Sequence, residues 1–506
     1  MLAEELFANH LQRPLGRGHT PADAFTGAAG GAACGDLVRI SVALDPDSHD
    51  ARILDVGFDA SGCGAAIAAG SATVALVRDR PLLQAARIGA GEIAAELGGL
   101  HPAKHHAAEL AADALHRALG AGARARAALS APASGSERTL VAMSGGVDSA
   151  VAALLVARTG QDVVGVTLEL WSDPENDGDR SCCSAQAVRG ARALAHSQGF
   201  PHLSIDLRAE FRAGVVEHWL ADHARGLTPN PCVRCNGDVR LDAMLELAGR
   251  LGAEWLATGH YARVHHQLGE DAPLLRMALD PVKDQSYVLA GLAPASLARL
   301  HFPLGDMTKT EVRQLAQDAG LAVARKPDSQ DLCFLAGTRL PRFLERHGAH
   351  AEQDAVGAMA TDGAPPGPAE GSIVDRDGRL LGRHRGARAF TIGQRHGLGI
   401  GGREPLYVLR TDPHENIVTV GPREELLTRT VAVRDVTLRR PGAHVDAIKI
   451  RSRGRRHPCR LMADADPGRH ASVEVELAEQ IERTAPGQVA CLYAGDVILG
   501  YGTVAT

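Results

Sequence analysis

A chain of 506 residues is too long for one hydrophobic core and predicts three or four domains, and its 45% hydrophobic and 23% charged residues are ordinary for a globular protein. No stretch approaches the roughly 20 apolar residues of a membrane span, and residues 1–10 lack the pattern of a secretory signal, so we expect a soluble cytoplasmic protein. The net charge of −6 hides a basic segment, residues 376–460, with 19 Lys and Arg against 8 Asp and Glu. That excess indicates a polyanionic partner, and an arginine-rich solvated surface is the alternative.

Three short motifs in the first 120 residues carry groups that bind metals. They are Ala-Cys-Gly-Asp at 33–36, Ser-Gly-Cys-Gly at 61–64 and Lys-His-His-Ala-Ala-Glu at 104–109. In this order they resemble the iron–sulfur scaffolds of the IscU and NifU type, which implies an α+β scaffold domain over residues 1–120. The residues that match that family are Cys34, Asp36, Cys63 and His106.

The scaffold pattern is incomplete, because Ala107 stands where that family has its third cysteine. Two thiolates, one imidazole and one carboxylate can still bind zinc or hold a labile iron–sulfur cluster. The alternative is a retained fold that only docks a sulfur donor.

Residues 121–137 contain small residues, arginines, a proline and a Ser-Gly pair without hydrophobic periodicity. This composition predicts a flexible linker after a separate front domain.

The run Ser-Gly-Gly-Val-Asp-Ser at 144–149 lies between an apolar stretch, 139–143, and an alanine-rich run, 150–158. A glycine turn between a buried strand and a helix presents backbone N–H groups and the helix dipole to an anion. The run differs from a Walker A loop and looks like the PP-loop of ATP pyrophosphatases, which transfer AMP to a substrate oxygen and release pyrophosphate. An ordinary glycine turn is the alternative.

The remaining chain divides into three blocks. From 138 to 338, apolar runs alternate with helical patterns, which predicts a doubly wound α/β domain. The apolar runs are 139–143, 163–168, 203–207 and 255–258, and the helical patterns include 185–198 and 241–251. Residues 339–404 are rich in Pro and Gly and form a small central domain, and closely spaced β-rich runs over 405–506 predict an antiparallel β-barrel.

Six motifs follow one another from the PP-loop onward. They are the loop itself, Thr-Pro-Asn-Pro-Cys-Val-Arg-Cys-Asn at 228–236, Ala-Thr-Gly-His-Tyr at 257–261, Lys-Asp-Gln-Ser-Tyr at 283–287, Asp-Ser-Gln-Asp-Leu-Cys-Phe at 328–334, and the glycine-dense run at 391–402. Together they resemble the tRNA-specific 2-thiouridylases, the MnmA family, over residues 138–506. The resemblance implies an enzyme that uses ATP to adenylate the C2 oxygen of the wobble uridine of tRNA and then replaces that oxygen by sulfur.

The family's chemistry depends on two thiols. The resemblance implies that Cys333 carries a persulfide and that Cys235 is the nucleophile, whose pKa the neighbouring Arg234 could lower. Cys232 departs from the family, in which many members have aspartate at this position. Cys232, Cys235 and Cys333 could instead hold a 4Fe–4S cluster that delivers sulfur. Both mechanisms stay open, and we favour the cluster because Cys232 has no task in the persulfide scheme.

The resemblance also assigns ligand-binding residues. ATP would be bound by Ala142, Met143, Ser144, Gly145, Gly146, Val147, Asp148, Ser149, Leu168 and Gly259. The tRNA and its flipped base would be bound by Asn230, Pro231, Cys232, His260, Lys283, Asp284, Gln285, Arg451, Ser452 and Gln488. Asp148 could bind Mg²⁺, orient a loop amide or serve only as a helix N-cap.

The expected partners are tRNA, bound in part by residues 339–404, and a cysteine desulfurase or another sulfur donor, with no membrane and no DNA. The alternative function is an iron–sulfur or sulfur carrier whose thiolation part is inactive. A third interpretation is a different adenylating PP-loop enzyme, such as an amidotransferase. Against it, the sequence indicates no glutaminase domain, and the paired thiols would have no use.

Overall fold

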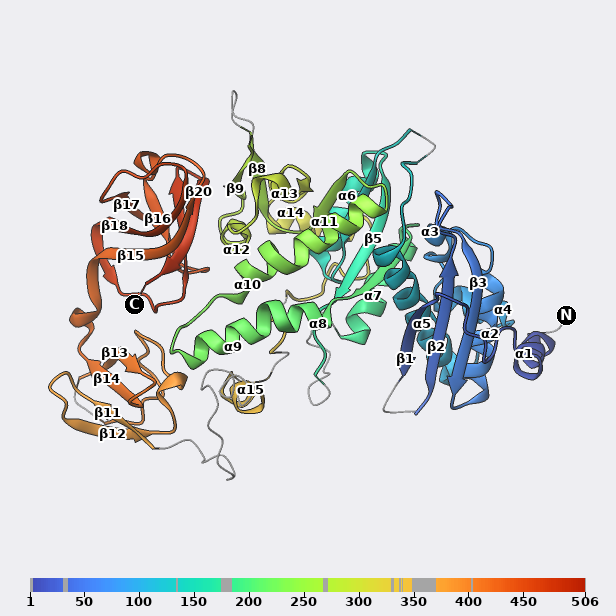
Figure 1. Ribbon diagram of the computed structural model, residues 1–506, viewed down its shortest axis with the longest axis horizontal. Helices are drawn as coiled ribbons and strands as arrows, with labels where there is room; N and C mark the ends of the chain where they lie inside the picture. Colours follow the sequence, from blue (N-terminus) through green and yellow to red (C-terminus); the bar gives the residue numbers. More distant parts are fainter. Residues whose placement is uncertain are drawn as a thin grey trace. The chain divides into compact units, whose positions relative to one another are not determined.

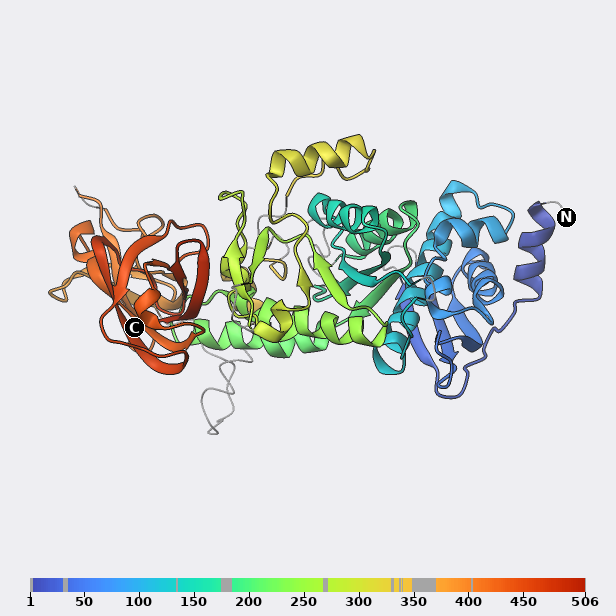
Figure 2. The ribbon, with the colours of Figure 1, turned by 90° about the horizontal axis from the view of Figure 1, so that it is seen from above.

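The computed structural model describes residues 3–30, 35–132, 135–173, 184–266, 272–328, 332–335, 338, 340–347, 370–401 and 404–505. The chain forms two compact units, whose secondary structure is drawn in Figures 1 and 2. The first unit holds Met1–Ala209, Leu241–Tyr261 and Arg299–Gly337, and the second holds Glu210–Arg240, Ala262–Ala298 and Thr338–Thr506. Within the described residues, every helix is too short or too polar to cross a membrane.

An α+β domain begins the first unit, as predicted (Figure 1). Its antiparallel strands, in the order β1-β2-β3, are β1 (Phe25–Gly30), β2 (Leu37–Leu44) and β3 (Ile53–Ser61). Its helices are α1 (Ala3–Gln12), α2 (Gly64–Val77), α3 (Leu82–Ala85), α4 (Ala90–Glu96) and α5 (His105–Ala125). Strand β2 buries Val38, Ile40 and Val42 against α2 and α5, because alternate residues of a strand point to the same face.

Helix α5 continues five residues past the boundary expected at residue 120, so the predicted linker at 121–137 is wrong at its start. Ala and Arg are strong helix formers, and nothing in 121–125 stops the helix. After the helix, Ala127 and Leu129 are buried, and the Leu129 N–H donates to the Arg250 carbonyl at 2.8 Å. The described part of this segment is therefore attached to the unit.

A doubly wound α/β domain fills the rest of the first unit, as predicted. Its parallel strands, in the order β10-β7-β4-β5-β6, are β4 (Arg138–Ala142), β5 (Asp162–Glu169), β6 (His202–Asp206), β7 (Trp255–Thr258) and β10 (Leu300–His301). Its main helices are α6 (Val147–Arg158), α7 (Ala185–Ser197), α11 (Leu241–Arg250) and α14 (Lys309–Asp318). The four predicted strands and the helices α7 and α11 agree to within one residue at each end, because buried parallel strands appear in a sequence as continuous apolar runs. Helix α6 begins three residues before the predicted run 150–158.

The front domain covers the edge of this parallel sheet at β6. Helix α5 approaches so closely that a Cβ added at Gly120 would lie 2.0 Å from the Ser204 carbonyl oxygen. The His202 N–H donates to the Ala86 carbonyl at 3.0 Å, and the His202 carbonyl oxygen lies 2.7 Å from Nδ1 of His116. The front domain thus satisfies backbone groups of an edge strand that would otherwise need water.

The helical part of the second unit carries the Cys-x-x-Cys motif. Helix α8 (Arg208–Phe211) spans the boundary between the units, and a π-helical turn at Arg212–Val216 leads into α9 (Glu217–Ala224). The motif itself occupies α10 (Pro231–Arg234) and a second π-helical turn, Cys235–Arg240. The other helices of this unit are α12 (Ser286–Leu289), α13 (Pro294–Leu297) and α15 (Leu340–His347).

The small central domain extends further than the predicted boundary at 404. Its sheet has the order β12-β11-β14-β13, formed by β11 (Gly371–Val374), β12 (Leu380–His384), β13 (Tyr407–Asp412) and β14 (Ile417–Gly421). Ile373, Val408 and Val418 share one core. β13 and β14 are strands as expected, but they belong to this sheet and not to the barrel.

The carboxy-terminal part forms the predicted β-barrel. Its sheet has the order β15-β18-β17-β16-β19-β20-β9-β8, and an additional pairing of β15 with β20 closes the barrel. The strands are β15 (Leu427–Leu438), β16 (Ala447–Lys449), β17 (His457–Leu461), β18 (Gly468–Glu482), β19 (Val489–Ala494), β20 (Val497–Val504), β8 (Ala262–His265) and β9 (Leu274–Met277). The hairpin β8–β9 was expected in the PP-loop domain, and its pairing with β20 corrects that boundary.

Candidate functional site

The predicted PP-loop lies at the carboxyl end of β4, where α/β sheets bind ligands. Gly145 has φ +68°, and an added Cβ would lie 2.9 Å from the Ala187 carbonyl oxygen of α7. A Cβ added at Gly146 would meet only the Ser144 hydroxyl, at 3.5 Å, and would fill open space over the loop. The Ser149 hydroxyl donates to the Gly146 carbonyl at 3.1 Å. The two glycines therefore leave a cradle of backbone that is open to an anion.

The strands on both sides of β4 bring further predicted nucleotide residues to the loop. β4 pairs with β5 and with β7, so Leu168 and Gly259 lie at the same carboxyl edge of the sheet as the loop. Gly259 packs against the start of α6, since an added Cβ would lie 2.7 Å from the Asp148 carbonyl carbon. Ala142 and Met143 end the central strand and are buried. The residues predicted to bind ATP thus lie together at this edge of the sheet, and their binding of ATP stays a prediction.

Asp148 has partners that the sequence did not indicate. Helix α6 has Gly146 as its N-cap, so the N-cap reading of Asp148 is wrong. Its carboxylate accepts from Nζ of Lys309 at 2.7 and 2.8 Å and from the Tyr261 hydroxyl at 2.9 Å. In this conformation the Asp148 carboxylate is engaged by a cation of the protein.

Sequence reasoning missed two lysines at the loop. Nζ of Lys326 donates to the Gly145 carbonyl at 2.9 Å, and Lys309, which is 12% exposed, also pairs with Asp328 at 2.9 Å. One sequence signal was available: unlike a Walker A loop, the run at 144–149 contains no lysine, so a phosphate-binding cation has to come from elsewhere in the chain.

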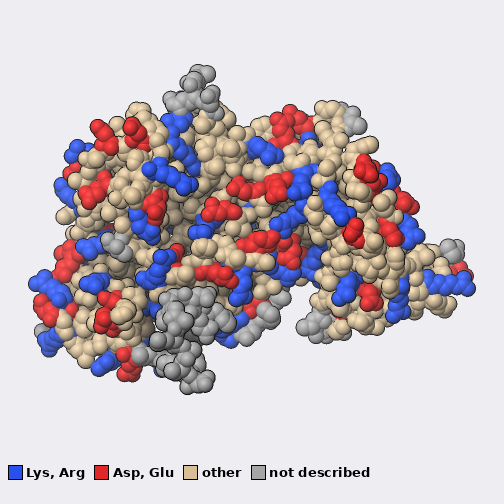
Figure 3. All heavy atoms as spheres, in the orientation of Figure 1, with Lys and Arg blue, Asp and Glu red and all other residues tan. Residues whose placement is uncertain are grey.

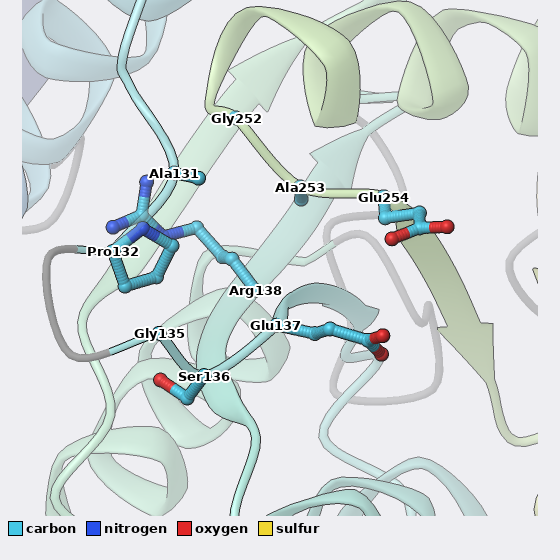
Figure 4. Close-up of a pocket in the computed structure, with 9 residues that line it drawn as sticks. All are labelled: Ala131, Pro132, Gly135, Ser136, Glu137, Arg138, Gly252, Ala253 and Glu254. Carbon is cyan, nitrogen blue, oxygen red and sulfur yellow. The ribbon is translucent and has the colours of Figure 1, made fainter.

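One hollow of the first unit lies beside β4, away from the PP-loop. It measures about 430 Å³ and is lined by residues such as Pro132, Arg138 and Glu254 (Figure 4). These residues lie at the amino end of β4 and β7, the edge opposite the PP-loop. Ligands of parallel sheets bind at the carboxyl edge, so we assign no nucleotide to this hollow.

The Cys-x-x-Cys motif lies in the second unit at the start of a helix. The Asn230 side chain caps α10 by accepting from the Cys232 N–H at 3.0 Å, and Pro231 occupies the first helical position. Cys232 and Cys235 are three residues apart on helical backbone, so their side chains lie on neighbouring positions of one face. This spacing fits two ligands of one metal cluster or two reacting thiols.

Burial raises the pKa of Cys232, and the charge of Arg240 opposes that shift. Cys235 is buried, with 9% of its surface exposed. Arg234, expected to act on the thiols, donates its Nε–H to the Gly214 carbonyl at 2.8 Å. The charge that acts on Cys232 comes from Arg240, and the expected effect of Arg234 on Cys235 stays a prediction.

Cys333 belongs to the first unit and lies in a turn closed by the Leu335 N–H and the Leu332 carbonyl at 3.1 Å. It is half-buried, whereas its neighbour Phe334 is 1% exposed and packs edge-on against Trp171. Phe334 anchors the turn, and the thiol of Cys333 is not the buried hydrophobic group that a purely structural role would require.

Among the predicted tRNA residues, Asp284 is a structural group. Its side chain has no exposed surface, and its carboxylate accepts from the Ala278 N–H at 3.1 Å and from the Ser286 hydroxyl at 3.0 Å. The carboxylate is thus engaged within the fold, and the expected contact of Asp284 with tRNA stays a prediction. Lys283 and Gln285 flank it and are half-buried.

Of the other predicted tRNA residues, Pro231 is buried, whereas the rest keep accessible surface. Arg451 and Ser452 are exposed on the barrel, and Gln488 donates to the Thr228 carbonyl, which holds the segment before the Cys-x-x-Cys motif against the barrel. In the first unit, half-buried His260 lies 2.8 Å from the Thr258 hydroxyl through Nδ1.

The basic excess of residues 376–460 is partly neutralised by ion pairs. On the face shown in Figure 3, blue and red side chains are interspersed. Within the barrel and central domain the pairs include Arg455 with Glu479, Arg460 with Glu476, Arg423 with Glu482 and Arg376 with Glu425. Three of these glutamates lie on β18, outside the counted segment, so the composition overstated the positive field.

The front domain brings three of its four predicted ligands together. Oδ2 of Asp36 lies 3.0 Å from Nε2 of His106 and 3.2 Å from Sγ of Cys63. Cys34 lies outside the described residues. An added Cβ at Gly62, which has φ +120°, would lie 2.0 Å from Oδ1 of Asp36, so glycine is required beside the cluster.

This cluster fits a zinc-sized ion. The ligand atoms of Asp36, Cys63 and His106 all lie within 4.8 Å of one another, and the donor set of sulfur, nitrogen and oxygen is one that zinc accepts. Burial would raise the pKa of Asp36, but hydrogen bonds from Cys63 and His106 outweigh it and hold that pKa below its ordinary value. Ala107 is fully buried and offers no ligand.

Comparisons with known proteins agree with this architecture. Family models match residues 4–127 as a NifU-like N-terminal domain, 137–337 as a tRNA methyl transferase HUP domain, 366–422 as a tRNA methyl transferase PRC-barrel domain and 437–504 as an aminomethyltransferase β-barrel domain. The "Bifunctional protein NifU/MnmA" of Rubrobacter xylanophilus is 42% identical over 98% of this chain and 97% of its own length. The chain belongs to the NifU/MnmA family.

Relatives of the MnmA type alone match the later part of this family member. The "tRNA-specific 2-thiouridylase MnmA" of Solibacter usitatus is 41% identical over 72% of this chain and 98% of its own length. A solved structure, a putative iron–sulfur cluster assembly scaffold protein of Fervidobacterium islandicum, is similar to 23% of this chain and 94% of its own, at 19% identity and a TM-score of 0.20. From that last similarity we take nothing further.

Proposed function

We propose that this protein is an ATP-dependent tRNA 2-thiouridylase that modifies the wobble uridine. The observation that carries the proposal is the PP-loop at the carboxyl edge of the parallel sheet, flanked by Leu168 and Gly259, in a chain of this family. ATP, with Mg²⁺, would bind there with its phosphates on the open backbone of Gly145 and Gly146.

The proposed reaction has two steps. The uridine O2 attacks the α-phosphorus of ATP, an O–P bond forms, and pyrophosphate leaves. Sulfur then bonds to C2, the C2–O2 bond breaks, and AMP departs with the oxygen. Adenylation is needed because the unmodified oxygen is a poor leaving group, and the base has to leave the anticodon stack to reach the loop.

Two sources of sulfur agree with the thiols. In the first, the terminal sulfur of a Cys333 persulfide attacks C2, Cys235 then forms a disulfide with Cys333, and an external thiol reductant restores both thiols. In the second, Cys232, Cys235 and Cys333 hold a 4Fe–4S cluster, which when bound would supply sulfide. The one-face spacing of Cys232 and Cys235 supports the second route, because the first leaves Cys232 without a task.

We propose that the front domain handles the metal or the sulfur for this reaction, with a cysteine desulfurase or a similar donor as partner. The Asp36–Cys63–His106 cluster supports zinc, or a labile cluster completed by Cys34. The same cluster supports a second candidate function, an iron–sulfur or sulfur carrier. Cluster transfer from this protein to an apo-acceptor without ATP or tRNA would favour the carrier.

The test is thiolation of unmodified tRNA under strict anaerobiosis. Metal-free protein with a cysteine desulfurase is compared with cluster-reconstituted protein given inorganic sulfide. Activity only with the cluster, lost in Cys232→Ala but kept in the control Cys459→Ala, would favour cluster chemistry. Activity of metal-free protein would make Cys333 the carrier. Cys235→Ser should abolish thiolation and spare tRNA binding, and persistent thiolation would refute the role of Cys235.

A further inference from the structure

The PP-loop needs a cation that its own sequence does not contain. ATP carries several negative charges. When the bond between the α-phosphorus and pyrophosphate breaks, further negative charge develops on the departing pyrophosphate. Backbone N–H groups and a helix dipole supply only partial charges. A side-chain cation that remains close to the loop would therefore contribute both to binding and to departure of pyrophosphate.

Lys326 is placed to be that cation. Its ammonium donates to the Gly145 carbonyl at 2.9 Å, inside the loop, while the residue itself is exposed to solvent. The ammonium is therefore bound to the loop residue that precedes Gly146. A lysine held by a single neutral carbonyl can turn to an arriving phosphate at little cost, because a charge-assisted hydrogen bond replaces a weaker one.

The segment around Lys326 is held by Arg313 of α14. Its guanidinium donates to the Ala324 carbonyl at 2.9 Å, to the Lys326 carbonyl at 3.2 Å and to Oδ1 of Asp328 at 2.9 Å. These contacts fix the backbone on both sides of Lys326. Arg313 therefore positions the lysine without pointing at the loop.

Lys309 joins this segment to the first turn of α6. Its ammonium binds the carboxylates of Asp148, at 2.7 and 2.8 Å, and of Asp328, at 2.9 Å. Three cations, Lys309, Arg313 and Lys326, thus accompany two carboxylates at the loop. The carboxylates are neutralised by the two interior cations, which leaves the charge of Lys326 for a ligand.

We propose that Lys326 binds the β- and γ-phosphates of ATP and the departing pyrophosphate, and that Arg313 and Lys309 are the residues that position it. This inference rests on the proposed use of ATP at the PP-loop. It assigns to the segment 324–328 a function in phosphate binding that is separate from the reactions of the cysteine thiols.

The experiment measures binding of AMP, ATP and inorganic pyrophosphate to the full chain by calorimetry. Lys326→Met should weaken the binding of ATP and of pyrophosphate by about tenfold or more. It should change the affinity for AMP by less than twofold, because AMP lacks the two outer phosphates. Lys326→Arg should restore most of the loss. Lys104→Met, at an exposed lysine of the front domain, is the matched control and should bind all three like the wild type.

The positioning role has its own readout. Arg313→Met should weaken pyrophosphate binding, and Arg313→Lys should not rescue it, because an ammonium cannot make the three contacts of the fork. The double variant Lys326→Met/Arg313→Met should bind pyrophosphate within twofold of Lys326→Met alone, since Arg313 acts through Lys326. Additive losses would overturn the positioning role.

Equal losses for AMP and ATP, or unchanged ATP binding in Lys326→Met, would overturn the assignment of Lys326. Wild-type protein that binds none of the three ligands would instead refute the proposed function. Thermal unfolding of each variant separates loss of binding from loss of fold.

Discussion

Asp113 of α5 and Arg192 of α7 form an ion pair of 2.6 Å in which both side chains are almost fully buried. Arg189, on the same helix, donates to the other oxygen of Asp113 at 2.7 Å and to Glu109 at 3.0 Å. A buried carboxylate with two guanidinium partners fixes the front domain to the PP-loop domain within the first unit. The scaffold-like domain is thereby a docked part of the enzyme.

Removal of Asp113 should strongly destabilise the first unit. Asp113→Ala leaves Arg192 buried without its carboxylate, and such a change costs about 3–5 kcal/mol. Denaturant unfolding followed by circular dichroism measures it. Glu246→Ala removes an exposed pair with Arg250 and should cost less than about 1 kcal/mol. Similar losses in both variants would contradict the docking role of Asp113.

A methyl group at Gly120 should act against the usual trend. Replacing glycine by alanine within a helix ordinarily raises the free energy of unfolding by about 0.5–1 kcal/mol. Gly91 in α4 has open space around it, so Gly91→Ala should show that increase or no change. Gly120→Ala should instead lower the melting temperature and expose residues 126–132 to protease, because its Cβ would lie 2.0 Å from the Ser204 carbonyl oxygen. A stabilised Gly120→Ala would mean that α5 is not packed on β6.

Acid should weaken the second unit through His223. Burial against Trp219 lowers the pKa of His223 from 6.5 to about 4. Since the unfolded chain binds this proton first, the stability contributed by neutral His223 is complete above pH 6.5. It falls by roughly 1.4 kcal/mol per pH unit as the pH drops from 6.5 to 4. Urea midpoints of wild type and His223→Gln over pH 4–8 test this, and parallel curves would show that His223 titrates normally.

The front cluster should bind one zinc ion per chain. Cobalt reports the ligands, because a thiolate ligand adds a sulfur-to-metal charge-transfer band to the spectrum. Cys63→Ser should remove that band or shift it strongly, and Asp36→Ala should weaken binding by tenfold or more, about 1.4 kcal/mol. Cys459→Ser is the control, because burial raises the pKa of its thiol to about 12 and disfavours metal binding. Unchanged binding in Cys63→Ser would place the metal elsewhere.

The strands and helices of the PP-loop domain were predictable because each carries its own signal. β4 and β7 are short apolar runs, and α7 has an amphipathic pattern, so local sequence is enough. The choice of sheet is different. β13 lies in a β-rich run that the sequence predicted, whereas β9 was not predicted as a strand. The partners of both, β14 and β20, are decided by tertiary packing.

The residues of the site divide in the same way. Gly145 and Gly146 were found because a phosphate loop requires consecutive glycines at a fixed spacing. Lys309 is 161 positions from Asp148 and stands in an ordinary helix start, so its pairing has no local signature. A motif does not show whether a carboxylate faces solvent or the fold, so the burial of the Asp284 side chain had no signal in the sequence.

The cover over β6 has a consequence for how this polypeptide can be divided. Without residues 1–125, the His202 N–H and carbonyl and the Asp206 carbonyl would lose the partners that Ala86, His116 and Arg124 provide, and Glu169 would lose Arg117. The remaining fragment would expose the unpaired edge of β6 and the Glu169 carboxylate without its cation. An unpaired strand edge favours association between copies of the fragment. Splitting the gene at the boundary should therefore yield a soluble thiouridylase fragment only when both halves are produced together.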